Sequence, residues 1–201
     1  MARLQLNKSS LARETANLQT YKRFLPSLDL KRQQLMAERA KAAAAVKRID
    51  AEIAAFHDTI GKELPMLANL EIDLADLVRV TAVELGEENI VGTTLPTLER
   101  IEIAVRPYSF LAKPHWVDRL VKRLKDMLDL QVRAQIARRR LSLLDRAVDV
   151  ITQRVNLFDK VLIPRTAANI KKIRIYLSDE EMAAVVRSKI AKRKRAEMEP
   201  A

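Results

Sequence analysis

The feature that most limits the fold of this chain is an apolar stripe in its C-terminal half. Stepping alternately by three and four residues from Met127 to Leu162 meets an apolar residue every time. This 3.5-residue period is typical of helices that supercoil around a partner helix. It predicts a long coiled-coil helix. The stripe comprises Met127, Leu130, Ala134, Ala137, Leu141, Leu144, Val148, Ile151, Val155, Phe158 and Leu162.

The N-terminal half carries a second stripe with the same period. Only Arg32 and Arg39 interrupt it. Two stripes in one chain predict that its two ends pair as a coiled coil. The apolar members are Leu18, Tyr21, Leu25, Leu28, Leu35, Ala42, Val46, Ile49, Ile53, Phe56 and Ile60.

The region between the stripes has a different pattern. Segments 78–85 and 98–105 are rich in β-branched residues, and the second alternates apolar with polar side chains, as a strand with one solvated face does. Two of the chain's three glycines lie in 86–97, which predicts the connection of a β-hairpin there. Pro107 is expected to end the second strand, and Pro114 suits the first turn of the returning helix.

The predicted fold is therefore mainly α: a long antiparallel two-helix coiled coil with a small β-hairpin inserted between its helices. Its parts are a helix in 1–75, the insertion in 76–113 and a second helix in 114–195, all within one elongated domain. Composition agrees, because three glycines and 4% aromatic residues suit few, long helices better than a globular core.

Charge and cysteine content limit the environment of the chain. A net charge of +11 favours an acidic partner, which could be nucleic acid, an anionic membrane surface or a protein. Without cysteine, an apolar leader or a run of about 18 apolar residues, the chain is expected to be cytoplasmic and to have no transmembrane segment.

The apolar stripe changes register near Pro164. Phe158, Leu162, Thr166 and Ile170 are spaced four apart, which is a stutter that locally unwinds a supercoil. A proline inside a helix costs roughly 3 kcal/mol because it removes a hydrogen bond and clashes with the preceding turn. The combination predicts a bend or a change of partner surface, and a kink without a role is the alternative.

Residues for catalysis or for metal binding are scarce. No phosphate-binding loop is present, and His57 and His115 lack the neighbouring ligands that a zinc site needs. No enzyme activity, cofactor or metal is expected. Trp116 is predicted to pack where the returning helix meets the hairpin.

The C-terminal end is strongly basic but keeps interleaved apolar residues, which predicts a single-helix extension. Two other functions stay open on the sequence: a nucleic-acid-binding coiled coil that also uses Arg138–Arg140, and a coiled-coil scaffold. The basic residues are Arg187, Lys189, Lys192, Arg193, Lys194 and Arg195.

The segment 154–165, RVNLFDKVLIPR, resembles a motif of the D subunits of the V-type and A-type rotary ATPases, R-V-N-A-L-E-x-V-x-I-P-x. The similarity extends over nearly the whole chain, from segment 6–11 through 28–35 to the basic C-terminus. Segment 23–28, which contains Pro26, departs from the uninterrupted helix of many members. The motif residues that match, and that would form a bend, are Arg154, Val155, Asn156, Ile163 and Pro164.

The resemblance implies a central rotor axle that transmits torque without touching nucleotide. Its basic end would lie inside a ring of catalytic and nucleotide-binding subunits (A and B). The opposite end would hold the small F subunit of the rotor and face a funnel-shaped adaptor on the membrane ring, so the chain would be peripheral to the membrane. The insertion residues implied in partner binding are Gly86, Val91, Gly92 and Pro96.

Overall fold

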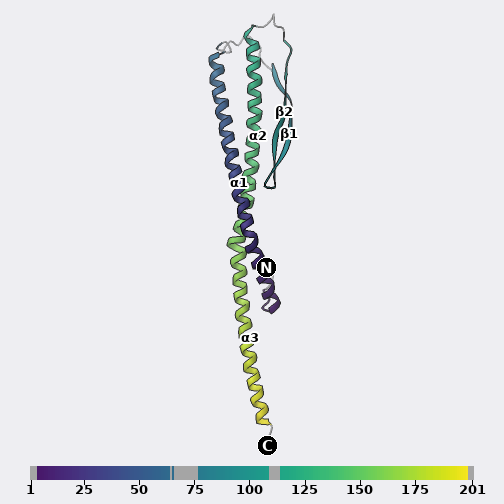
Figure 1. The fold of residues 1–201 in the computed structure, drawn as a ribbon, viewed down its shortest axis with the longest axis vertical. Helices are drawn as coiled ribbons and strands as arrows, with labels where there is room; N and C mark the ends of the chain where they lie inside the picture. Colours follow the sequence, from purple (N-terminus) through teal and green to yellow (C-terminus); the bar gives the residue numbers. More distant parts are fainter. Residues whose placement is uncertain (1–3, 64, 66–76, 109–113, 199–201) are drawn as a thin grey trace. The chain divides into compact units, whose positions relative to one another are not determined.

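The computed structural model describes residues 4–63, 65, 77–108 and 114–198, with side chains to residue 195. Its elements are α1 (Lys8–Glu63), β1 (Val78–Ile90), β2 (Thr93–Val105), α2 (Trp116–Asn156), the π-helix η2 (Leu157–Leu162) and α3 (Ile163–Met198) (Figure 1). The prediction of a mainly α chain with a hairpin between two long helical segments is confirmed. The predicted boundaries at 75–76 and 113 lie outside the described residues.

Helix α1 has a clear start signal. The Asn7 side-chain oxygen accepts the backbone N–H of Ser10 at 2.7 Å, which satisfies one of the free donors of the first turn. Pro26 lies inside α1, and the nearby Ser27 hydroxyl donates to the Phe24 carbonyl at 2.8 Å. Pro65, two residues after the end of α1, is typical of the sequence that follows a helix.

The hairpin is longer than the sequence predicted. Its strands pair from Val78↔Val105 to Ile90↔Thr93, so the connection lies within the predicted segment 86–97 but is only two residues long, and the rest of that segment is strand. The true turn is Val91–Gly92, with φ of 53° and 77°. Positive φ at both central residues is typical of a type I′ turn, whose twist matches that of the strands. Glycine adopts it freely, whereas a β-branched residue such as Val91 rarely does.

The two strands also contain irregularities. The register shifts between Val80 and Ala82 and again between Glu84 and Leu85, which leaves Thr81 on β1 and Glu99 on β2 as extra residues. Such β-bulges strengthen the local twist of a two-stranded ribbon. At the tip, the Asn89 side-chain oxygen accepts the Gly92 N–H at 2.9 Å, which helps to hold the turn.

The chain forms two compact units, residues 32–150 and residues 1–31 with 151–201. In the first unit, Asp50 contacts Arg138 at 2.7 Å and Glu63 contacts Arg123 at 2.9 Å. Arg39 also contacts Asp145. Later residues of α1 thus contact earlier residues of α2, so the two helices of this unit run antiparallel.

The second unit shows the same antiparallel order in its own contacts. The Asn169 amide donates to the Glu14 carboxylate at 3.2 Å, and Lys8 lies 3.7 Å from Glu181. The rings of Tyr21 and Phe158 meet edge to face, with centroids 5.5 Å apart. Such aromatic pairs stabilise more than their buried area alone.

A small core joins the hairpin to α2 in the unit 32–150. Leu77, Val117 and Val121 are buried together. Trp116 and Val105 pack against them, so the prediction that Trp116 lies where the returning helix meets the hairpin is confirmed. Pro114 precedes α2 rather than lying in its first turn, and its carbonyl accepts the Val117 N–H at 3.0 Å.

Candidate functional site

The apolar residues of the two predicted stripes share one property in the structure. Each of them, from Leu18 to Ile60 and from Met127 to Leu162, is buried or half-buried. Leu35 and Leu144 are nearly completely buried. Arg39, which shares the register of the first stripe, is exposed and forms an ion pair with Asp145. A charged residue can therefore occupy this register at the edge of the helix pair.

The family-like motif 154–165 covers the junction of α2, η2 and α3. Val155 is buried, Asn156 and Ile163 are half-buried, and Arg154 and Pro164 are exposed. The N–H of Ile163 donates to the carbonyl of Phe158, five residues back, which is the bond pattern of a π-helix. The register change seen in the sequence therefore coincides with one wider helical turn.

This wider turn changes the setting of Pro164. A regular α-helix would pair the carbonyl of Lys160 with an N–H at residue 164, which proline lacks. In the structure Pro164 instead directly follows the π-turn, in which a hydrogen bond runs five residues back rather than four. Beyond it, the Thr166 hydroxyl donates to the Leu162 carbonyl at 2.7 Å. The π-turn thus accommodates the proline, a feature that the sequence reasoning missed.

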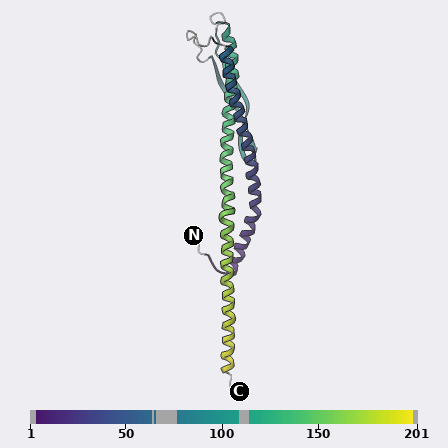
Figure 2. The ribbon, with the colours of Figure 1, turned by 90° about the vertical axis from the view of Figure 1, so that its left-hand side faces the viewer.

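The C-terminal part of α3 is an exposed surface that carries both basic and large apolar side chains. Its predicted basic residues, Arg187 to Arg195, are all exposed. In the views of Figures 1 and 2, no other described segment of its own unit lies beside this end of the helix. Large apolar side chains are at least half exposed at helical spacing on the same segment: Met182, Val185, Val186 and Ile190.

Such an end differs from an ordinary solvated helix. Residues 182, 185, 186 and 190 follow the i, i+3, i+4 pattern of a helix face that is buried against a partner. Surrounding arginine and lysine residues suit a partner with an acidic rim. The end of α3 therefore combines an apolar face with exposed basic side chains.

The predicted insertion residues lie in the outer half of the hairpin. Val91 and Gly92 form the turn, while Gly86 and Pro96 are strand residues close to one another across the ladder. A Cβ on Gly86 would come within 2.3 Å of a Glu99 carboxylate oxygen, so glycine gives room to that bulged side chain. Pro96 is tolerated because β2 has a partner on one side only in this two-stranded sheet.

An open groove lies between the hairpin and α2. Its volume is about 1080 Å³, and both elements contribute apolar side chains to it. Val83 and Leu85 of β1 remain exposed there. The main apolar lining residues are Val80, Val83, Leu85, Leu128, Val132 and Ile136.

The arginine cluster 138–140 is largely engaged within the unit 32–150. Arg138 binds Asp50, and Arg140 donates to the Glu88 carboxylate at 2.7 Å and to the Pro96 carbonyl at 3.1 Å. The sequence suggested this cluster only as a phosphate-binding patch. The contact of Arg140 with the hairpin was missed, because its partners are 44 and 52 residues away.

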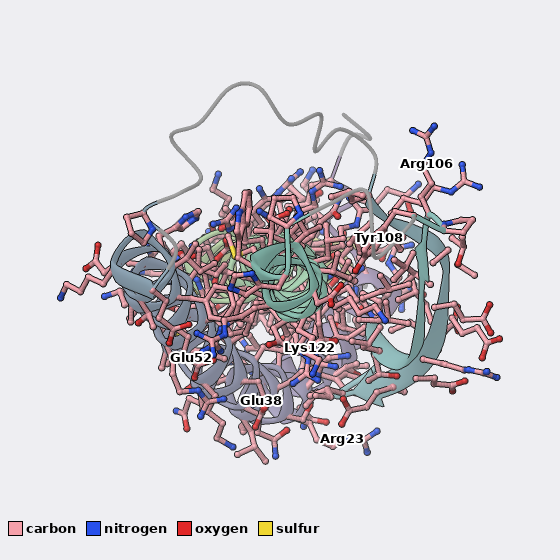
Figure 3. All side chains as sticks on the ribbon, turned by 90° about the horizontal axis from the view of Figure 1, so that it is seen from above. Arg23, Glu38, Glu52, Arg106, Tyr108 and Lys122 are labelled. Carbon is pink, nitrogen blue, oxygen red and sulfur yellow. The ribbon has the colours of Figure 1, made fainter. Side chains whose placement is uncertain are left out.

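At the base of the hairpin, the Tyr108 hydroxyl donates to the Asp118 carboxylate at 2.6 Å. This hydrogen bond, with burial and the negative charge of Asp118 as further causes, raises the pKa of Tyr108 above its usual 10.0. In Figure 3 the Tyr108 side chain lies on the side of the helices, whereas the Arg106 side chain points outward.

Within residues 4–63, 65, 77–108 and 114–198, no cluster of three or more potential His, Cys, Asp or Glu ligands is placed to hold a metal. The helices of these same ranges include none with a stretch long and apolar enough to cross a bilayer.

Comparison with known proteins identifies the family. The family model for the ATP synthase D subunit matches residues 10–193. The D subunit of a V-type ATP synthase from Borreliella burgdorferi is 36% identical over 192 residues, covering 96% of this chain and 95% of the relative. The D subunit of Chlamydia trachomatis is 35% identical, covering 96% of each chain, and that of Chlamydia felis is 33% identical, covering 96% of this chain and 94% of the relative. The chain therefore belongs to the family of ATP synthase D subunits.

Proposed function

We propose that this chain is the central axle of a V-type rotary ATPase, a non-catalytic component that transmits torque between the catalytic ring and the membrane ring. The observation that carries the proposal is the exposed end of α3 in a member of this family. A basic helix with an apolar face suits insertion into a ring of A and B subunits.

The other partners follow from the same proposal. The hairpin region would hold the F subunit, with Gly86, Val91, Gly92 and Pro96 in the segment concerned. The far end would meet the funnel-shaped adaptor, which makes the chain peripheral to the membrane and cytoplasmic. Pro164 and η2 would give the axle its bend, so that it acts on one member of the ring at a time.

An antiparallel helix pair is mechanically suited to this role. Ion pairs between α1 and α2, such as Asp50–Arg138 and Glu63–Arg123, tie the helices of the unit 32–150 at intervals. Individually such exposed pairs contribute little. Together with the buried stripe they oppose sliding of one helix past the other, which a shaft under torque requires.

The nucleic-acid alternative loses support from the arginine cluster. Arg138 and Arg140 both bind carboxylates within their own unit, so a phosphate would have to displace these carboxylates. That alternative also gives no reason for the hairpin. It remains a defined outcome of the experiment below.

The test is reconstitution of the purified chain with the F subunit and the catalytic ring of A and B subunits. One variant ends after Leu177, and another carries Lys192→Glu with Arg193→Glu. Arg146→Glu, which reverses the charge of an exposed residue of α2, is the control. We expect the full chain and the control to co-elute with the ring at one copy and to alter ATP turnover. Both α3 variants should bind weakly.

A different result would favour the nucleic-acid function over the axle. If the full chain joins no ring and instead binds DNA or RNA with an affinity that falls by orders of magnitude between low and moderate salt, the nucleic-acid function replaces the axle.

A further inference from the structure

The open groove beside the hairpin has one wall on α2. Leu128, Val132 and Ile136 line it at four-residue intervals, and Leu143 also lines it. Residues spaced in this way lie on one side of a helix. None of the four belongs to the stripe that pairs α2 with α1, so α2 carries a second apolar face. Between residues 128 and 143 the helix rises about 22 Å, which sets the length of the groove.

The hairpin supplies the other wall, and a β-bulge shapes it. Val80 and Val83 both line the groove, although residues three apart on a regular strand point to opposite faces. The extra residue Thr81 lies between them and brings both to one face. Leu85, two residues further on, lines the groove as well. Val83 and Leu85 are 38% and 54% exposed, so this wall is apolar and uncovered.

The hairpin is held on α2 at its base and in its outer half. Leu77 at the base is buried with Val117 of α2. In the outer half, Leu95 is completely buried, and the carbonyl of Pro96 accepts a hydrogen bond from Arg140. The groove therefore exists before any partner arrives, and a preformed site binds with a smaller loss of conformational entropy.

On its other side the groove adjoins a second hollow. This hollow of about 500 Å³ is lined by Ile53 and His57 of α1. Gln131 and Gln135 of α2 line both hollows, which together form a trough with α2 as its floor and with the hairpin and α1 as its sides. Both glutamine side chains are exposed, so a partner can form hydrogen bonds with them.

The charged residues of the trough indicate the chemistry of a partner. Arg138 lines the trough and already pairs with Asp50. Arg139 and Glu87 also line it and are exposed, and neither makes an ion pair or hydrogen bond among the described residues. A partner carboxylate can pair with Arg139, and a partner cation with Glu87. The phosphate backbone of a nucleic acid would instead need several free cations.

The free edge of the hairpin does not suit an added strand. β1 has one unpaired edge in this two-stranded sheet, but its register is broken at Thr81, and it carries Glu84, Glu87 and Glu88 close together. Bulges and charges of this kind protect an edge from pairing with another strand. A helix instead fills an apolar groove with one face, through residues spaced i, i+3, i+4 and i+7.

We propose that this trough binds one amphipathic helix of a partner protein. The helix is about 15 residues long, which matches the length of the groove. Its apolar face packs on Val83, Leu85 and Val132, and one of its carboxylates pairs with Arg139. The choice of the F subunit as this partner rests on the proposed function, whereas the chemistry of the trough follows from its own residues.

Photo-crosslinking in the complex of the full chain with the purified F subunit tests the proposal. Photoreactive p-benzoylphenylalanine replaces Gln131 in one variant and Gln135 in another, both on the floor of the trough. Mass spectrometry should locate the crosslinks on F at residues three or four positions apart, as on one face of a helix. The same group in place of Asp126, an exposed residue of α2 outside both hollows, is the control and should give no crosslink to F.

Substitutions on the two walls test the apolar contact. Val83→Lys and Val132→Lys should each weaken the binding of F about tenfold or more, because each places an ammonium group in the apolar interface. Val83 is already partly exposed, so its substitution should leave the fold intact. Val150→Lys makes the same change at an exposed position of α2 outside the trough, and should bind F normally. Isothermal titration calorimetry measures these affinities.

A charge swap tests the contact of Arg139. Arg139→Glu should weaken binding about two- to fivefold, and the effect should shrink at high salt because the contact is partly exposed. Replacing by lysine the carboxylate of F that lies nearest in the crosslink map should restore the affinity of Arg139→Glu. Absence of this rescue would show that no carboxylate pairs with Arg139.

The other possible failures are distinguishable from one another. If F binds but neither glutamine position crosslinks to it and Val83→Lys binds normally, the trough is not its site and the proposal is wrong, while the assignment of F stands. Crosslinks at every second residue of F would show a strand in place of a helix. If F does not bind the full chain at all, this proposal and the assignment of F to the hairpin region are both overturned.

Discussion

At the scale of single residues, the contact between Tyr108 and Asp118 makes the base of the hairpin sensitive to alkali. The hydrogen bond to Asp118 raises the pKa of Tyr108 in the folded chain. The folded state therefore keeps its phenol proton at pH values where the unfolded state, with a pKa near 10.0, has lost it. The resulting stabilisation is complete below pH 10 and is lost as pH rises through the folded pKa.

We expect an absorbance titration of the phenols to show one group that ionises above pH 10 and that is absent in Tyr108→Phe. Thermal stability of the original chain should fall more steeply above pH 10 than that of Tyr108→Phe. Tyr176→Phe serves as the control, because its exposed hydroxyl makes no hydrogen bond in the described part of the chain. Parallel alkaline profiles for all three proteins would contradict this assignment.

Some features of single residues could not be predicted from the sequence. The turn lies within 86–97 as expected and includes Gly92, but Gly86 lies in a strand and Val91 is the other turn residue with a positive φ. Strand pairing along both sides of the ladder outweighed the poor turn propensity of valine. Arg140 was placed in a basic cluster, but no local pattern reveals a partner 52 residues away.

At the scale of elements, periodicity was a better guide. Two 3.5-residue stripes predicted the long helices, and the shift after Leu162 located an irregularity correctly. What the stripe could not predict is how the extra residue is accommodated, because a stutter can be spread over several turns or concentrated in one. The structure concentrates it in η2, directly before Pro164.

One deletion should test this explanation of η2. Removing the exposed Lys160 would bring Ile163, Thr166, Ile170 and Ile173 into the three-four register that Phe158 begins. The shortened segment should become continuous α-helix, but Pro164 would then lie in a helix interior at a cost of about 3 kcal/mol. For a chain of this size, that corresponds to a fall in Tm of roughly 6–12 °C.

The same deletion combined with Pro164→Ala should recover the lost stability, because the alanine supplies the missing N–H. Thermal melts followed by far-UV circular dichroism measure both effects. Deletion of Ser188, in the exposed end of α3, is the control and should leave Tm nearly unchanged. If deleting Lys160 alone does not lower Tm, η2 does not arise from one residue in excess.

At the scale of the whole molecule, two properties of the isolated chain oppose each other. The apolar residues Met182, Val185, Val186 and Ile190 are exposed at helical spacing and favour association. The net charge of +11 opposes it. Added salt favours association, because it screens the charge repulsion and does not weaken hydrophobic contact. The Debye length falls from about 8 Å at 0.15 M to about 3 Å at 1 M.

We therefore expect the isolated chain to be a monomer at low salt and to self-associate as salt rises, whereas a chain that ends after Leu177 stays monomeric throughout. Val185→Lys should prevent association, while Ser188→Lys adds the same charge three residues away without breaking the apolar face and should reduce it much less. Sedimentation velocity at several salt concentrations distinguishes these cases. Equal behaviour of the two lysine variants would show that charge alone controls association. The apolar face at the end of α3 would then not be a partner-binding surface.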